Sequence, residues 1–202
     1  MACGAVLAKN KKPQRPTGAG QKVVYCCAMM KVKNAIALFT GAFLLASISA
    51  WAMPKAGDVA PAFEGVDQNT NTIKLADFAG KKNVLLYFYP KDFTGGCTKE
   101  ACGFRDRMGD LAQDNVAVIG VSHDSSESHF KFAQEYNLKF PLIADTSGEI
   151  IKAYGTKMAV LSMSSRVSFL ICTDGKVIHV TDSMNPQKHF DEMQAAIAAL
   201  NK

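Results

Sequence analysis

The sequence predicts an α/β fold in which helices flank a central mixed β-sheet. Two continuously apolar runs, Val84–Tyr89 and Val116–Val121, are typical of strands that are buried on both faces of a sheet. Between them, apolar residues recur at spacings of three and four over residues 97–113, which predicts an amphipathic helix. Later in the chain, Asp174-Gly175 separates two further apolar runs and indicates a β-hairpin. A strand–helix–strand unit followed by a hairpin requires both parallel and antiparallel pairing.

Shorter patterns predict the remaining elements. Residues 57–63 are expected to form an extended arm, because Pro61 argues against a helix there. The other expected elements, in chain order, are a short strand over 72–75, a turn over 77–80, a helix over 125–136 with Phe130 and Ala133 facing inward, a short strand over 141–144, a short helix over 148–154, strands over 167–171 and 177–180, and a terminal amphipathic helix marked by Phe190, Met193, Ile197 and Leu200. This order is that of a thioredoxin-like fold.

The positive charge of the chain is concentrated near its N-terminus. The whole chain has a formal net charge of +5, from 23 basic and 18 acidic residues. Residues 1–52 contain seven of the basic residues and no acidic one, so residues 53–202 have a net charge of −2. The positive net charge of the chain comes from residues 1–52, so it is no reason to expect that residues 53–202 bind nucleic acid.

Residues 30–52 have the layout of a secretory signal peptide. Two lysines precede an apolar run over residues 35–50, and Ala50-Trp51-Ala52 has the A-x-A form of a cleavage site. The run is shorter than the ~20 residues that span a membrane. We therefore expect export to the bacterial periplasm with cleavage near Ala52 and no stable membrane association afterwards, in preference to an uncleaved anchor.

The remaining parts of the chain are a short upstream piece and one domain. Residues 1–29 are interpreted as a non-native upstream extension, from a wrongly assigned start codon, or as a long leader. Residues 53–202 have the length of one domain with its own core. They contain Cys97, Cys102 and Cys172. An oxidising location permits a disulfide, and an odd count leaves one thiol over.

Cys97 carries the strongest functional signal. It follows a buried strand that stops at Pro90 and a short loop with glycines, and it lies at the start of a helical pattern. The N-terminus of a helix offers free N–H groups and a partial positive charge, which favour a thiolate over a thiol. Cys102, five positions on, supplies a resolving partner. These features predict a thiol-based redox enzyme; the alternative for Cys97 is a buried structural thiol.

At this point a family resemblance becomes specific. The segment Pro90-Lys-Asp-Phe-Thr94-Gly-Gly-Cys97 resembles the P-x-x-x-T-x-x-C signature of the peroxiredoxins. Tyr87–Asp92 and Cys97–Asp106 are similar to the bacterioferritin-comigratory, or peroxiredoxin Q, subfamily, and the likeness extends from about Gly57 to the C-terminal helix. The resemblance implies a thiol-specific peroxidase of thioredoxin-like fold that reduces hydrogen peroxide and organic hydroperoxides. It also implies a thioredoxin-like reductant, no metal or other cofactor, and a monomer.

The resemblance implies a role for each of five residues. Cys97 would be the peroxidatic cysteine, which forms a sulfenic acid, and Cys102 the resolving cysteine, which forms a Cys97–Cys102 disulfide. Thr94 would hold the thiolate and orient the peroxide, Pro90 would shield the site from water, and Arg166 would stabilise the thiolate and the charge that develops on the peroxide. From the residues alone, Thr94 is equally suited to cap a helix, Pro90 to end a strand, and Arg166 to form a surface ion pair.

The spacing of the two cysteines sets a geometric condition. Residues five apart on one α-helix have Cα atoms roughly 8–9 Å apart, whereas a disulfide needs them within about 7 Å. We therefore expect the first turns of the helix to unwind after the sulfenic acid forms and to refold on reduction.

Some positions depart from the family pattern, and two other functions stay open. Gly95 stands where many members have proline, and Cys172 stands where an acidic residue often follows the strand; we interpret Cys172 as a small strand-end residue. The four histidines, His123, His129, His179 and His189, lack metal-ligand spacing and are interpreted as surface or core residues. The alternatives are a periplasmic thiol-disulfide oxidoreductase, for which the usual C-x-x-C spacing is missing, and a non-enzymatic thioredoxin-fold binding module with a structural disulfide.

Overall fold

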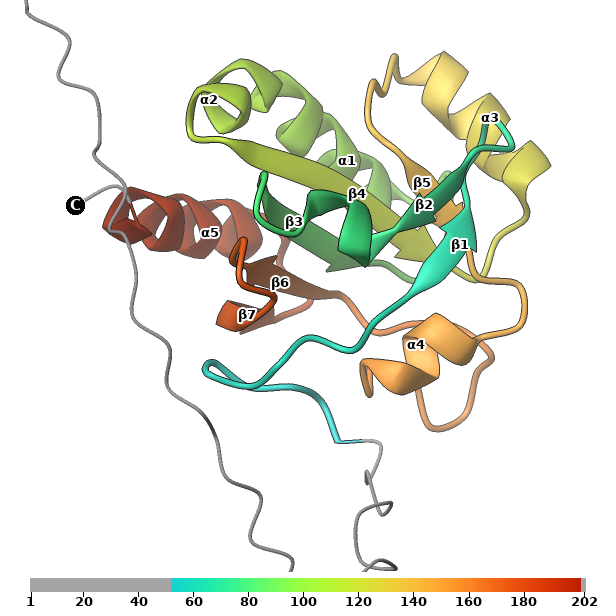
Figure 1. Ribbon diagram of the computed structural model, residues 1–202. Coiled ribbons are helices and arrows are strands. Elements are labelled where there is room, and N and C mark those ends of the chain that lie inside the picture. The colour runs from blue at the N-terminus through green and yellow to red at the C-terminus, as the bar shows by residue number, and fades with distance from the viewer. Residues whose placement is uncertain (1–51, 201–202) are drawn as a thin grey trace, which may run out of the picture. The chain divides into compact units, whose positions relative to one another are not determined.

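A five-stranded mixed sheet lies at the centre of the part of the chain that the computed structural model describes, residues 52–200 (Figure 1). The strand order is β5-β4-β3-β6-β7. β4 is parallel to both of its neighbours, whereas β3–β6 and β6–β7 are antiparallel. The strands are β3 (Asn83–Phe88), β4 (Val116–Ser122), β5 (Leu142–Ala144), β6 (Val167–Ile171) and β7 (Val177–Asp182). The expected fold class, a mixed sheet flanked by helices, is confirmed.

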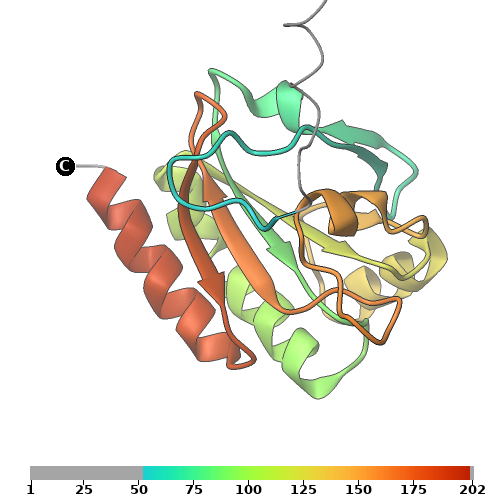
Figure 2. The same ribbon diagram turned by 90° about the horizontal axis from the view of Figure 1, so that it is seen from below.

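Helices cover both faces of this sheet. The helices are α1 (Gly95–Asp106), α2 (Met108–Gln113), α3 (Ser126–Glu135), α4 (Glu149–Ala153) and α5 (Pro186–Leu200). Figure 2 shows α1 beside α5, with α4 on the opposite side of the sheet. Successive side chains of a strand point to opposite faces, so Leu85 and Tyr87 of β3 pack with α1, α3 and α5, while Leu86 and Phe88 pack toward α4.

The segment before the sheet is largely irregular. Residues 57–63 form no helix, and their backbone bonds to the β6–β7 hairpin through Gly57 N–H to Val177 O and Ala60 N–H to Gly175 O. β1 (Glu64–Val66), which the sequence did not predict, pairs antiparallel with the expected short strand β2 (Thr72–Lys74). A 3-10 helix, η1 (Leu75–Phe78), stands where a turn over 77–80 was expected.

The single helix expected over residues 97–113 is wrong, because it breaks at Arg107. The backbone of Arg107 leaves the helical region, with φ −99° and ψ 2°, and its N–H bonds to Phe104 O at 3.1 Å. In a continuous α-helix that N–H would bond to Gly103 O. The Arg107 side chain takes that carbonyl instead, through Nη1 at 3.0 Å, and its guanidinium lies over the Phe190 ring.

The inward face of α3 also differs from the expectation. Phe130 was expected to face the core but is 43% exposed, whereas Ala133 is buried as expected. Ser125 caps the helix by accepting a hydrogen bond from the Ser128 N–H. With the helix starting there, His129 and Phe132 lie on its buried face. Hydrophobic periodicity placed Ala133 correctly but Phe130 wrongly, because one of the residues on the inward face is a histidine. Leu200, at the end of α5, is likewise exposed.

The interpretation of residues 1–29 and of the signal peptide concerns residues outside the described part, apart from Ala52. Within residues 52–200, no helix is both long enough and apolar enough to cross a membrane.

Candidate active site

Cys97 lies in the first turn of α1, where the loop that leaves β3 enters the helix. Thr94 is the N-cap residue, with an extended backbone, and α1 begins at Gly95. The Cys97 side chain is only 2% exposed. The thiol is therefore largely shielded from water and held at the positive end of a helix, where free N–H groups favour a negative charge.

Arg166 provides a fixed cation at this thiol. Its Nη2 lies 3.3 Å from Cys97 Sγ, and its Nη1 forms an ion pair with the Glu100 carboxylate. Arg166 precedes β6, and the register that sets Val167 opposite Phe88 brings it to the end of β3 from which the active-site loop leaves. A Cβ at Gly96 would lie 2.9 Å from Arg166 Nη2, so the close approach of the guanidinium requires a glycine there.

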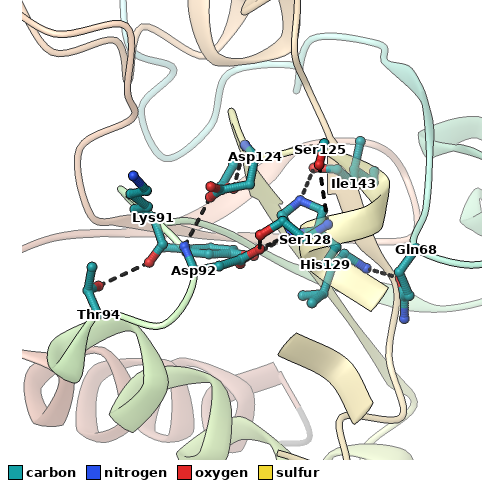
Figure 3. Close-up of polar contacts among 12 residues, drawn as sticks. Gln68, Lys91, Asp92, Thr94, Asp124, Ser125, Ser128, His129 and Ile143 are labelled. Atoms are coloured by element: carbon teal, nitrogen blue, oxygen red, sulfur yellow. Dashed lines mark hydrogen bonds and ion pairs between the residues drawn. The ribbon is translucent and has the colours of Figure 1, made fainter. Parts of the chain in front are cut away.

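Thr94 and Pro90 occupy the loop before Cys97. The Thr94 side chain is exposed, and its hydroxyl donates to Lys91 O at 3.0 Å, which closes the loop rather than capping α1 (Figure 3). Pro90 is partly exposed and follows β3 by two residues. The Thr94 hydroxyl is thus directed to Lys91 O, whereas Arg166 contacts the buried Cys97 sulfur.

Three comparisons with known proteins agree. Residues 56–180 match the model of the AhpC/TSA family. The chain is 41% identical over 143 residues to peroxiredoxin Bcp of Escherichia coli (strain K12), an alignment that covers 68% of this chain and 91% of the relative. It is 36% identical over 146 residues to chloroplastic peroxiredoxin Q of Sedum lineare, with 71% and 78% covered.

A solved structure is similar as well. Peroxidoxin BcpB from Mycobacterium tuberculosis superposes with a TM-score of 0.69 at 34% identity, covering 72% of this chain and 97% of the other. The chain belongs to the AhpC/TSA family, among the Bcp and Q peroxiredoxins. The family resemblance and the thioredoxin-like fold are thereby confirmed. This peroxiredoxin is a thiol peroxidase, an oxidoreductase, and the comparisons do not favour either alternative function.

The other two described cysteines of this peroxiredoxin differ in their distance from the site. Cys97 and Cys102 are both free thiols on the intact helix α1. Cys172 follows β6, where the antiparallel register sets Ile171 opposite Val84 at the start of β3. Cys172 therefore lies at the end of the sheet remote from Cys97. No group of three or more His, Cys, Asp or Glu side chains within residues 52–200 is arranged to hold a metal ion.

Glu100 is a functional residue that the sequence reasoning did not assign. It lies three positions after Cys97 on the same face of α1 and is fully buried. Burial raises the pKa of Glu100 to about 7, although the neighbouring Arg166 charge lowers it. Its Oε1 has no hydrogen-bond partner and lies 3.6 Å from Nδ1 of His189, whose pKa burial lowers. The guanidinium of Arg166 therefore lies between the Glu100 carboxyl group and the Cys97 thiol and interacts with both.

The raised pKa of Glu100 predicts how stability depends on pH. The folded protein holds this proton more tightly than the unfolded chain, so the stabilisation is complete below the usual pKa of 4.5 and is lost as pH rises to about 7. We expect Glu100→Gln to remove a decline of roughly 3 kcal/mol in the free energy of unfolding over that range. Urea titrations of both proteins at several pH values measure it, with Glu149→Gln as the exposed control. Parallel pH profiles for wild type and Glu100→Gln would contradict the prediction.

Proposed function

We propose that this peroxiredoxin reduces hydrogen peroxide and organic hydroperoxides through a sulfenic acid on Cys97. The supporting observation is the 3.3 Å approach of the Arg166 guanidinium to the Cys97 sulfur at a helix N-terminus. The thiolate attacks one peroxide oxygen, the O–O bond breaks, and the second oxygen leaves with the electron pair. That oxygen takes up a proton and departs as water or an alcohol, so the sulfur is oxidised as the peroxide is reduced. Arg166 stabilises the charge that develops on the departing oxygen.

Cys102 then resolves the sulfenic acid. Its thiolate attacks the Cys97 sulfur, the S–OH bond breaks, and hydroxide leaves and is protonated to water. The resulting Cys97–Cys102 disulfide is returned to two thiols by a thioredoxin-like reductant. Both cysteines lie on α1, and five residues of intact helix hold Cα atoms roughly 8–9 Å apart, beyond the reach of a disulfide. The first turns of α1 must therefore unwind in each cycle.

This unwinding predicts a difference in amide exchange between the two redox states. In the oxidised protein, amides of residues 97–103 are expected to exchange at least about tenfold faster than in the reduced protein, because their helical hydrogen bonds are broken. Amides of β3 and β6 provide the internal control, since neither strand has to move. Hydrogen exchange followed by mass spectrometry measures both. Equal protection of α1 in the two states would overturn the unwinding step while leaving the peroxidase chemistry intact.

A coupled assay tests the proposed function itself. Peroxide consumption is followed with thioredoxin, thioredoxin reductase and NADPH, using residues 53–202. We expect steady turnover with wild type and with Cys172→Ser, whose cysteine is remote from the site, but single-turnover consumption alone with Cys102→Ser. If the wild-type protein consumes no peroxide with this or with a dithiol reductant, the proposal is wrong.

We also propose that the protein acts as a monomer after export to the periplasm and cleavage near Ala52. Export and cleavage are proposed from the charge and apolar pattern of residues 30–52, and the monomer from the resemblance to the peroxiredoxin Q subfamily. Expression in a bacterial host, followed by intact mass of the periplasmic fraction, tests the cleavage. Recovery of only uncleaved chain in the membrane fraction would contradict it. Light scattering of the cleaved protein tests the monomer.

A further inference from the structure

We propose that Asp92 and His129 form a buried hydrogen-bonded pair that fixes the active-site loop, residues 90–94, and that both are positioning residues for the reaction of Cys97. Neither residue touches the Cys97 thiol. The inference rests on the proposed function, because the reaction that the pair supports is attack of Cys97 on a peroxide. The pair joins the loop that precedes α1 to helix α3 (Figure 3).

The Asp92 carboxyl group is buried and has hydrogen-bond partners at both oxygens. It is 3% exposed, although it lies in a loop between β3 and α1. Its Oδ1 accepts a hydrogen bond from the Tyr89 hydroxyl at 2.9 Å, and its Oδ2 accepts from the Ser128 hydroxyl at 2.7 Å and from His129 Nδ1 at 2.9 Å. Three side chains on two oxygens satisfy the hydrogen bonds of this buried carboxyl group within the protein.

The His129 ring faces an acceptor at each nitrogen. Nδ1 points to the Asp92 carboxylate, and Nε2 lies 3.2 Å from the backbone carbonyl of Ile143 on β5. The Tyr89 hydroxyl, which donates to Asp92, lies 3.3 Å from Nδ1. The ring is thus held by Asp92 of the loop on one side and by β5 on the other, so it ties the loop to the sheet.

The pair acts on a stretch of backbone that needs support. Phe93, between Asp92 and the N-cap Thr94, has φ +59°, a left-handed conformation that is costly for a residue with a bulky side chain. The Asp92 N–H donates to Asp124 Oδ2 at 3.0 Å, and the Phe93 ring packs edge-on against Phe132 of α3. The loop is thus fixed to the β4–α3 side at Asp92 and at the strained residue Phe93 itself.

The Asp92–His129 pair fixes the loop of residues 90–94, which precedes the first turns of α1 that are proposed to unwind. Arg166 reaches Cys97 from β6, whereas the loop positions the start of α1, so a shift of the loop would move the thiol relative to its cation. Misplacement by about 1 Å can cost about a hundredfold in rate. Loss of the pair should therefore slow the peroxide step. It should not slow the closure of the disulfide, because that step requires α1 to loosen.

Rates of the two steps in matched variants test the proposal. Reduced protein is mixed with hydrogen peroxide, quenched over time with a thiol-blocking reagent, and analysed by intact mass. Asp92→Asn and His129→Gln are each expected to slow oxidation of Cys97 by about ten- to a hundredfold, with no further loss in the double variant. Disulfide closure should be unchanged or faster. Ser128→Ala should give a smaller loss, and His179→Gln, on β7, should match wild type.

Wild-type oxidation rates in Asp92→Asn, or equal slowing of both steps, would overturn the positioning role. A wild-type protein that does not react at Cys97 would overturn the proposed function instead.

Discussion

Cys97→Ser is expected to lower the rate of peroxide reduction by at least about a thousandfold. A serine hydroxyl in the same position has nearly the same size but does not ionise near neutral pH, and it is a much weaker nucleophile. The buried Arg166 and the N-terminus of α1 then have no thiolate to stabilise. The loss should therefore appear in the chemical step rather than in the fold.

Single-turnover peroxide consumption by the reduced protein measures this effect. Urea unfolding shows whether Cys97→Ser keeps the stability of wild type, as we expect from the similar size of the two side chains. Cys172→Ser is the matched control, since it makes the same replacement at the far end of the sheet. Retained consumption in Cys97→Ser would mean that another group reacts with the peroxide.

Arg166→Gln is expected to slow the oxidation of Cys97 by about a hundred- to a thousandfold. The guanidinium is 3% exposed, and one of its nitrogens faces the thiol while another binds Glu100. A glutamine can donate one or two hydrogen bonds but supplies no charge. Arg166→Lys should be intermediate, because an ammonium retains the charge but lacks the planar fork that reaches both partners.

Removing Arg166 also leaves the buried Glu100 without its cation, so the folded protein must hold the carboxyl group in its neutral form, which costs stability at neutral pH. The double variant Arg166→Gln, Glu100→Gln controls for this cost. It should recover stability but not the rate of oxidation. Recovery of the rate in the double variant would show that Arg166 acts by maintaining the fold rather than by stabilising the thiolate.

The sequence predicted most of the sheet because its central strands are buried on both faces. β3 and β4 are continuously apolar, so their pattern is unambiguous, and the Asp174-Gly175 turn marks the β6–β7 hairpin. The errors arose where polar side chains decide the local structure. The Arg107 side chain ends α1 by taking a backbone carbonyl, and His129 faces the core where an apolar residue was expected.

The site could be predicted only in part for a related reason. Cys97 is visible from its position after a strand and at a helix start, but Arg166 is 69 residues away and meets it through the pairing of β6 with β3. Only the family resemblance linked the two. Glu100 has a signal, its spacing of three from Cys97 on one helix face. The burial of Asp92 depends on contacts with α3 that no local pattern encodes.

Intact mass of reduced residues 53–202 after one equivalent of hydrogen peroxide tests the central claim most directly. If Cys97 forms a sulfenic acid that Cys102 captures, wild type should lose about two mass units and Cys102→Ser should gain about sixteen. Peptide mapping should assign the loss to a bond between Cys97 and Cys102. A mass gain of about sixteen on a methionine peptide, with both thiols still free in wild type, would contradict the account.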